Sequence, residues 1–300
     1  MSAVALPGRL DTATRGLAWG ALGVLIFALT LPMTRLAVGD ASAPQLPPAF
    51  VTAGRAALAG LLAVAYLLAT GAHRPPRRTW APLALSAGGT VLGFPLGLAL
   101  ALREVPSAHA AVVTGVLPLA TAVVGALAAR QRPSAGFWAA AGAGCALVLG
   151  FAAWQGGGAL VAADAWLAMA VATGAVGYVA GARAGAVLPA PQVISWVLVG
   201  ALPFTLPAAW ASWPVAPVSA AAWGGFLYTA VFSMWLGFFA WYHGLALGGV
   251  LRVSQVQLLQ PFLAILAAAL LLGEALELAT VGFALAVLAV VALGRRTRIA

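Results

Sequence analysis

Residues 107–129 read SAHAAVVTGVLPLATAVVGALAA, a run with no acidic residue and no arginine. A helix of about 20 apolar residues crosses the hydrocarbon core of a bilayer. With this run, ten apolar stretches cover about 16–37, 48–70, 80–102, 107–129, 135–154, 160–182, 191–212, 219–242, 250–272 and 277–294. Because lipid offers no hydrogen-bond partner to a free backbone group, each stretch is expected to be helical. The predicted fold class is an all-α polytopic membrane protein with ten transmembrane helices.

The composition agrees with a lipid environment. Hydrophobic residues make up 63% of the chain and charged residues 7%, whereas a soluble domain carries about 25% charged residues. All 15 basic residues are arginines, mostly in short segments between apolar runs, so the formal charge of +9 sets orientation and does not indicate a nucleic-acid partner. Cys145 is the one cysteine, which excludes an intrachain disulfide and a cysteine-rich metal site. No cofactor or metal is expected.

The loop arginines alternate between the two sides of the predicted bundle. One side holds Arg9, Arg15, Arg74, Arg77, Arg78, Arg130, Arg132, Arg183, Arg252, Arg295, Arg296 and Arg298. The other side holds Arg103 with the acids Asp40, Glu104, Asp164, Glu274 and Glu277. Because basic loops face the cytoplasm, we expect a multi-pass protein of the cell inner membrane with both termini cytoplasmic.

The first apolar run has some features of a secretory signal peptide. Arg9 and Arg15 precede it, and the small residues 41–43 follow it. Its apolar stretch, however, exceeds the usual length of about 7–15 residues, and Arg35 and Asp40 stand where a cleavage region is neutral. We therefore interpret this run as a retained first helix.

An internal repeat appears when the sequence is shifted by 143 residues. The matched pairs are Trp80 with Trp223, Pro118 with Pro261, and Gln131 with Glu274. These coincidences indicate a duplication, with units at 1–155 and 156–300. Since each unit has an odd number of helices, the second must be inverted in the membrane. Inverted five-helix repeats are typical of secondary transporters, in which the two units exchange conformations.

Several landmarks occur in an order that resembles a known family. They are Trp19-Gly20, residues 31–37 (LPMTRLA), residues 48–55 (PAFVTAGR), Ser107-Ala108, residues 116–119 (VLPL), Leu259-Gln260-Pro261 and Leu272-Gly273-Glu274. The likeness is to the EamA type of the drug/metabolite transporter superfamily and covers nearly the whole chain. It implies a ten-helix carrier closest in character to exporters of amino acids and related metabolites. Gln131 departs from the glutamate that the family often has there.

The two symmetric prolines suggest where a substrate would bind. Pro118 and Pro261 each remove a helical hydrogen bond, and free backbone at membrane depth is tolerated where it lines a water-filled cavity. We expect them, with Gly93 and Pro32, to act as hinges. The alternative is that the prolines are packing kinks and that Gly93 only permits close helix contact.

Polar and aromatic side chains near these prolines are candidate substrate ligands. Amides cost free energy in lipid and should point inward, or else join helices together. Large aromatic residues could form an apolar wall, although a purely structural core role is the alternative. The candidates are Ser254, Gln257, Gln260, Trp235, Tyr228, Tyr178 and Phe94.

Charged residues within the runs are few. Arg35 and Arg55 are expected near the outer ends of their helices, where they could snorkel or pair with a loop acid; the alternative is that one binds a substrate carboxylate. His109 and Glu274 are the groups that could carry a coupling proton. Because no acid lies mid-span, we expect transport to be facilitative or at most loosely coupled to protons.

The sequence thus predicts a secondary transporter that exports small metabolites, amino acids among them, by alternating access. The partners are a small-molecule substrate and the bilayer, and a monomer is compatible with the pattern. An intramembrane enzyme is the first alternative, but no HExxH helix or nucleophile elbow is present. A channel, which would need a charged ring or a filter motif, and a carrier of another neutral metabolite are the others.

Overall fold

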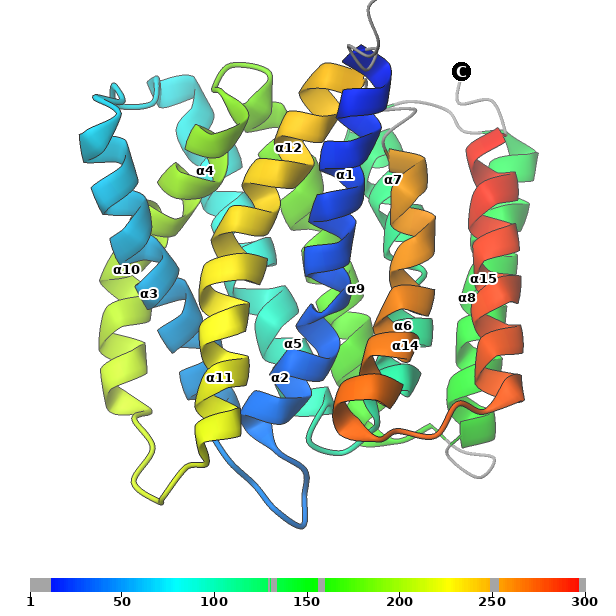
Figure 1. Cartoon of the computed structure of the whole chain (residues 1–300). Coiled ribbons are helices and arrows are strands. Elements are labelled where there is room, and N and C mark those ends of the chain that lie inside the picture. The colour runs from blue at the N-terminus through cyan, green and yellow to red at the C-terminus, as the bar shows by residue number, and fades with distance from the viewer. Residues whose placement is uncertain (1–11, 129, 131–133, 156–159, 249–253, 297–300) are drawn as a thin grey trace, which may run out of the picture.

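The computed structural model describes residues 12–128, 130, 134–155, 160–248 and 254–296. The regular secondary structure of these residues is helical, and the one pair of β-bridged residues among them is Gly39 with Pro44 in a loop. Most of the helices run between the same two ends of a single bundle (Figure 1).

The first half of the chain forms ten helical elements within its described residues. They are α1 (Thr12–Ala28), α2 (Thr30–Val38), α3 (Pro48–Ala69), the 3₁₀ turn η1 (Arg77–Thr79), α4 (Trp80–Ser86), the π-helix η2 (Ala87–Gly93), α5 (Phe94–Ala101), α6 (Ser107–Thr114), α7 (Leu117–Ala128) and α8 (Ala135–Gln155).

The second half follows the same plan. Its elements are α9 (Ala162–Gly185), α10 (Ala190–Ala211), α11 (Ala220–Tyr228), the π-helix η3 (Thr229–Leu236), α12 (Gly237–Gly248), the 3₁₀ helix η4 (Ser254–Leu259), α14 (Gln260–Leu272) and α15 (Leu278–Arg296).

Seven helical segments of the described chain are long and apolar enough to cross a membrane. They are Thr14–Val38, Pro48–Ala69, Arg77–Ala101, Ser107–Ala128, Ala162–Gly185, Ala190–Ala211 and Ala220–Gly244. The three other expected runs contain the shorter apolar helices Trp138–Trp154, Gln260–Leu272 and Leu278–Val290. The chain is therefore an all-helical, multi-pass membrane protein.

The termini and loops lie at the two ends of the bundle in the order that the predicted alternation of the connecting segments requires. The start of α1 and the end of α15 lie at the same end of the bundle, together with the α9–α10 loop (Figure 1). The loop from α2 to α3 and the loop from α10 to α11 lie at the opposite end (Figure 1). We call these the terminal end and the far end.

The repeat is visible in the irregular segments of the backbone. The π-helix η2 covers residues 87–93, and a shift of 143 carries it to 230–236, within η3 at Thr229–Leu236. The break between α6 and α7 falls just before Pro118, and η4 gives way to α14 just before Pro261. Because proline has no N–H and clashes with the preceding turn, an α-helix breaks at these positions. The α1–α2 break before Pro32 has the same cause.

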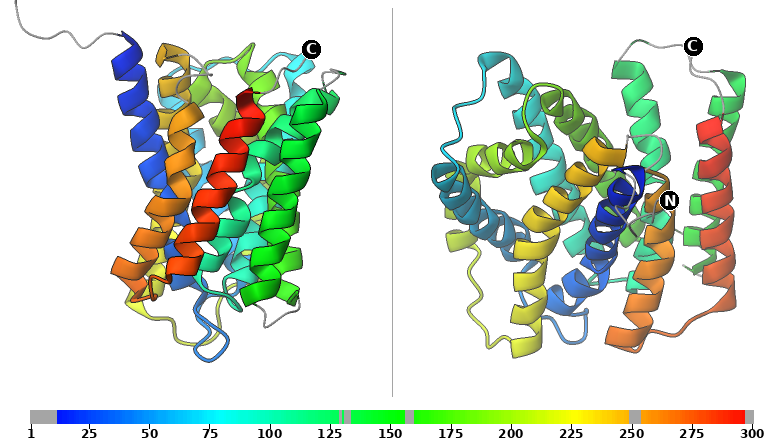
Figure 2. Two further views of the ribbon diagram at one scale, coloured as in Figure 1. Left: turned by 90° about the vertical axis from the view of Figure 1, so that its right-hand side faces the viewer. Right: turned by 45° about the horizontal axis from the view of Figure 1, so that its top comes forward.

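Small residues let the helices approach closely, as is usual in membranes. A Cβ on Gly23 would lie 3.0 Å from the backbone of Trp241, so α1 and α12 are in contact. A Cβ on Gly60 would lie 2.7 Å from Leu202, which joins α3 to α10. Helices α8 and α15 pack on each other at one side of the bundle (Figure 2).

Candidate functional site

A cavity of about 280 Å³ lies inside the bundle. This is close to the lower limit of small-molecule sites, about 300–1,000 Å³. Its polar lining residues are Thr30, Arg55, Thr90, Thr114, Thr121, Tyr178, Ser233, Tyr242, Gln257 and Gln260. Its aromatic wall also includes Phe27, Phe94, Phe238 and Trp241. Both halves of the chain contribute to it.

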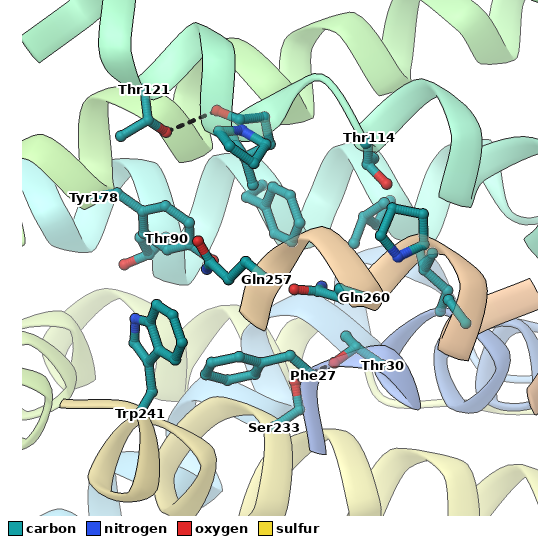
Figure 3. A pocket seen from close by; sticks show the side chains of 18 of the residues that line it. Phe27, Thr30, Thr90, Thr114, Thr121, Tyr178, Ser233, Trp241, Gln257 and Gln260 are labelled. Atoms are coloured by element: carbon teal, nitrogen blue, oxygen red, sulfur yellow. Dashed lines mark hydrogen bonds between the residues drawn. The ribbon is translucent and has the colours of Figure 1, made fainter. Parts of the chain in front are cut away.

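Gln257 and Gln260 project into the centre of this cavity. Figure 3 shows their amides between Thr30 and Ser233 on one side and Thr90 and Thr121 on the other. Gln257 lies in the last turn of η4, and Gln260 is the first residue of α14. Neither amide has a hydrogen-bond partner among the described residues, so both remain available to a ligand.

Both predicted proline breaks line the cavity. Pro118 and Pro261 are wall residues, and neither can donate to the carbonyl four residues earlier, which belongs to Thr114 and Gln257 respectively. The two breaks also meet, because a Cβ on Gly115 would lie 3.4 Å from Pro261 Cγ. Interrupted helices that meet across a repeat interface are the geometry of carrier binding sites.

The other sequence-predicted residues divide into two groups. Tyr178 and Phe94 line the cavity, whereas Trp235 and Tyr228 are not among the lining residues. The Trp235 Nε1–H donates to Ser195 Oγ at 3.3 Å, and the Tyr228 hydroxyl donates to the Ile26 carbonyl at 3.0 Å. Both therefore join helices outside the cavity lining.

The remaining candidates are the expected hinges and two positions outside the described residues. Gly93 ends η2, and a Cβ there would meet Thr173 Cβ at 2.7 Å, so its hydrogen is needed for contact with α9. Pro32 is buried in the first turn of α2 and is not among the lining residues. The side chain of Ser254, and Gln131 as a whole, lie outside the described residues.

Several cavity residues were not found from the sequence, although the repeat could have indicated them. The shift of 143 pairs lining residues with lining residues: Thr90 with Ser233, Leu98 with Trp241, Thr114 with Gln257, Leu117 with Gln260, Pro118 with Pro261, and Thr121 with Ala264. The cavity wall is therefore nearly two-fold symmetric in position. Its chemistry is asymmetric, since both glutamines belong to the second half.

Arg55 differs from the expectation of snorkelling or pairing with an acid. Arg55 is only 3% exposed and lines the cavity. Its Nη2 donates to Ser233 Oγ at 3.4 Å, a long hydrogen bond. Among the described residues Arg35 forms an ion pair with Asp40 at 3.8 Å, and His109 contacts Asp164. The expectation is thus met for Arg35 and wrong for Arg55.

Polar contacts join the elements at the far end of the bundle. Glu274 accepts the N–H groups of Ser107 and Ala108 at 2.9 and 3.0 Å. His109, 3% exposed, lies 2.8 Å from Asp164, measured from Nε2 to Oδ1. Both groups that could carry a proton therefore make contacts between elements, and neither is among the lining residues of the cavity.

Arg35 contributes a further contact at the same end. Its Nη1 donates to the backbone carbonyls of Leu102 and Val105. The Ser42 hydroxyl, followed by the N–H of Ala43, lowers the pKa of the Asp40 carboxyl, which is therefore charged at neutral pH and faces Arg35. These contacts tie the α2–α3 loop and the α5–α6 loop together.

Comparison with known proteins agrees with this geometry. The model of the EamA-like transporter family matches twice, over residues 14–152 and 161–294. The chain is 44% identical over 291 residues to "Uncharacterized transporter YdeK" of Bacillus subtilis (strain 168), covering 96% of this chain and 99% of the relative. A solved structure described as "Crystal structure of protein" has the same fold, with a TM-score of 0.62 at 19% identity, over 94% of this chain and 96% of its own. This chain belongs to the EamA-like transporter family, within the drug/metabolite transporter superfamily.

Proposed function

We propose that this transporter exports small metabolites, in particular amino acids with apolar or aromatic side chains, across the inner membrane by alternating access. The observation that carries the proposal is the cavity of about 280 Å³, lined at repeat-related positions by both halves of the chain. Its wall offers amides, hydroxyls and aromatic faces, which bind and orient a small molecule. A carrier, rather than an enzyme, fits this wall.

The topology in the proposal has ten spans and cytoplasmic termini. The seven long helices support the proposal, and it assigns the three remaining crossings to the shorter apolar helices. Arg74, in the loop after α3, and Arg183, in the last turn of α9, belong to the terminal end, and the acids Asp40 and Glu274, in the loops after α2 and α14, belong to the far end. The terminal end then faces the cytoplasm by the positive-inside rule.

The far-end contacts support a particular conformational state. Glu274, His109 and Arg35 hold neighbouring elements together between the cavity and the outer surface. A carrier tied at its outer end is closed to the outside and receives substrate from the cytoplasm. Exchange of conformations between the inverted repeats would open the other side.

Transport is proposed to follow the substrate gradient. The residues that line the cavity, in the part of the chain that is described, include no aspartate or glutamate. A carboxylate in the membrane interior is the usual carrier of a coupling proton. With His109 and Glu274 engaged elsewhere, a pH gradient alone is expected to drive no sustained uphill accumulation in proteoliposomes.

Counterflow in proteoliposomes tests the proposal. Vesicles loaded with unlabelled L-phenylalanine or L-leucine should accumulate the same labelled amino acid transiently, because a carrier exchanges substrate faster than it moves net substrate. A channel shows no such exchange stimulation, and an enzyme converts the labelled compound. Absence of counterflow for every amino acid, with activity for another neutral metabolite, would leave a carrier but remove the amino-acid assignment.

A further inference from the structure

Arg55 places a permanent positive charge in the wall of the cavity. It belongs to α3, is 3% exposed, and is a lining residue. A guanidinium is always protonated in proteins. Arg55 has no carboxylate within ion-pair distance among the described residues. A buried charge without a counter-ion is costly and is seldom kept for stability alone.

The hydrogen bonds of Arg55 are also incomplete. Nη2 makes the long contact of 3.4 Å to Ser233 Oγ, and that hydroxyl is already engaged with Thr30 Oγ1 at 2.8 Å. The Nε atom is buried with no hydrogen-bond partner among the described residues. Buried polar groups are normally paired, so an unpaired one needs an explanation. An anion in the cavity would supply both the missing charge and the missing acceptor.

We infer that Arg55 binds a carboxylate of the transported molecule and so determines the substrate class, an inference that rests on the cavity being the transport site. The planar guanidinium matches a carboxylate with two parallel hydrogen bonds. The charge balance also favours this anion, because Arg55 is the one formal charge among the described lining residues. A phosphate, with a charge of about −1.5 to −2 at neutral pH, would leave negative charge unbalanced.

The rest of the wall fits the remainder of such a molecule. Gln257 and Gln260 present free amides that can accept from an ammonium or hydroxyl group. The faces of Phe27, Phe94 and Trp241 suit an apolar side chain and attract a cation. An amino acid would therefore lie with its carboxylate on Arg55 and its other groups toward the second half.

A series of compounds with one shared side chain tests the inference. Binding of L-phenylalanine, L-phenylalaninamide, phenethylamine and 3-phenylpropanoate to the purified full-length protein in detergent is measured by titration calorimetry, and repeated with L-leucine, L-leucinamide and 4-methylpentanoate. Carboxylates should bind at least about tenfold more tightly than the amides and the amine, because the latter compounds lack the charged hydrogen bond to Arg55. Equal affinity for amides and carboxylates, or binding of none of the carboxylates, would overturn the inference.

Two variants separate binding from structure. In Arg55→Gln the preference for carboxylates should disappear, whereas the matched control Arg183→Gln, whose arginine donates to the Ala128 carbonyl outside the cavity lining, should retain it. Arg55→Met should melt, without substrate, at a temperature equal to or above that of the wild type, because an unpaired buried charge has been removed. A clearly lower melting temperature together with retained carboxylate preference would make Arg55 a structural residue.

The outcomes also separate this inference from the proposed function. If amino acids, their amides and the amine bind alike and amino acids show counterflow, the carrier assignment stands and the role of Arg55 is wrong. If 3-phenylpropanoate binds through Arg55 and no amino acid does, the carboxylate site stands and the amino-acid assignment is wrong.

Discussion

Glu274, at the end of the second half's broken helix, accepts the backbone N–H of Ser107, at the start of the first half's broken helix, at 2.9 Å. The same carboxylate accepts the N–H of Ala108 at 3.0 Å. The first N–H groups of a helix have no partner within the helix and carry partial positive charge. One carboxylate therefore caps α6 and ties α14 to it at the far end of the bundle.

Removing this cap should open the far end. Glu274→Ala loses two charge-assisted hydrogen bonds, which together stabilise the conformation closed at the far end by about 1–3 kcal/mol. The outward-open conformation does not contain these bonds, so the substitution should favour it. With Cys145→Ala as background, a cysteine at Thr114 in the cavity wall should react faster with an impermeant maleimide added outside intact cells. The matched control is Glu104→Gln, an exposed acid at the same end; equal rates in both variants would contradict the assignment of Glu274 as a tie.

The two cavity glutamines should affect transport more than stability. Gln260→Ala and Gln257→Ala remove side chains that bond to no described residue, so the melting temperature should change little. The counterflow rate or the apparent affinity should fall by up to about tenfold for each hydrogen bond to the substrate that is lost, because a neutral hydrogen bond contributes at most about 1.5 kcal/mol. Gln192→Ala, in the first turn of α10 away from the cavity lining, is the control. Normal transport by a folded Gln260→Ala protein would remove this residue from the site.

Two of the three glycines of η2, Gly88 and Gly93, should respond differently to a methyl group. A Cβ on Gly93 would come 2.7 Å from Thr173 Cβ, whereas one on Gly88 would meet nothing within 4 Å. Gly93→Ala should therefore destabilise the protein by about 1–3 kcal/mol through overpacking. Gly88→Ala should melt at the wild-type temperature or slightly above it, because alanine favours a helical backbone. If both variants have the same melting temperature, the contact between η2 and α9 is not as close as described.

The topology can be read with single cysteines. In the Cys145→Ala background, His73→Cys lies in the loop before η1, and Val215→Cys lies in the exposed loop between α10 and α11. An impermeant maleimide should label position 215 in intact cells and position 73 only after permeabilisation. The opposite pattern would invert the orientation, and labelling of both in intact cells would contradict the ten-span arrangement.

The aromatic residues show why part of the site could not be read from the sequence. Tyr228 and Trp235 are seven residues apart, which in a continuous α-helix places them on one face. The intervening segment is the π-helix η3, whose wider turns add a residue. Each added residue rotates the remainder of the helix by about 100°, from 3.6 residues per turn. The spacing of seven therefore does not place the two aromatics on one face here; both lie outside the cavity lining, and Trp241 is a wall residue.

Local composition and spacing along the chain are sufficient to predict the helices, their breaks and the duplication. Long apolar runs must form helices in lipid, and an interior proline removes a helical hydrogen bond, which here breaks the helices at Pro118 and Pro261 although α10 continues through Pro203 and Pro207. The repeat at a shift of 143 rests on the same kind of pattern and pairs Pro118 with Pro261, and the cost of amides in lipid predicts that Gln257 and Gln260, just before Pro261, belong to the same site.

The partners of the charged groups, in contrast, depend on how the helices pack in three dimensions. Arg35 and Arg55 are alike in sequence, since both lie near the outer ends of apolar runs, yet one faces Asp40 and the other faces the cavity. The direction of each side chain depends on helix rotation and on neighbours more than 60 residues away, such as Leu102 for Arg35 and Ser233 for Arg55. Electrostatic pairing acts over a few ångströms in space and carries no signature along the chain, so the unpaired charge of Arg55 became visible only when its surroundings were in place.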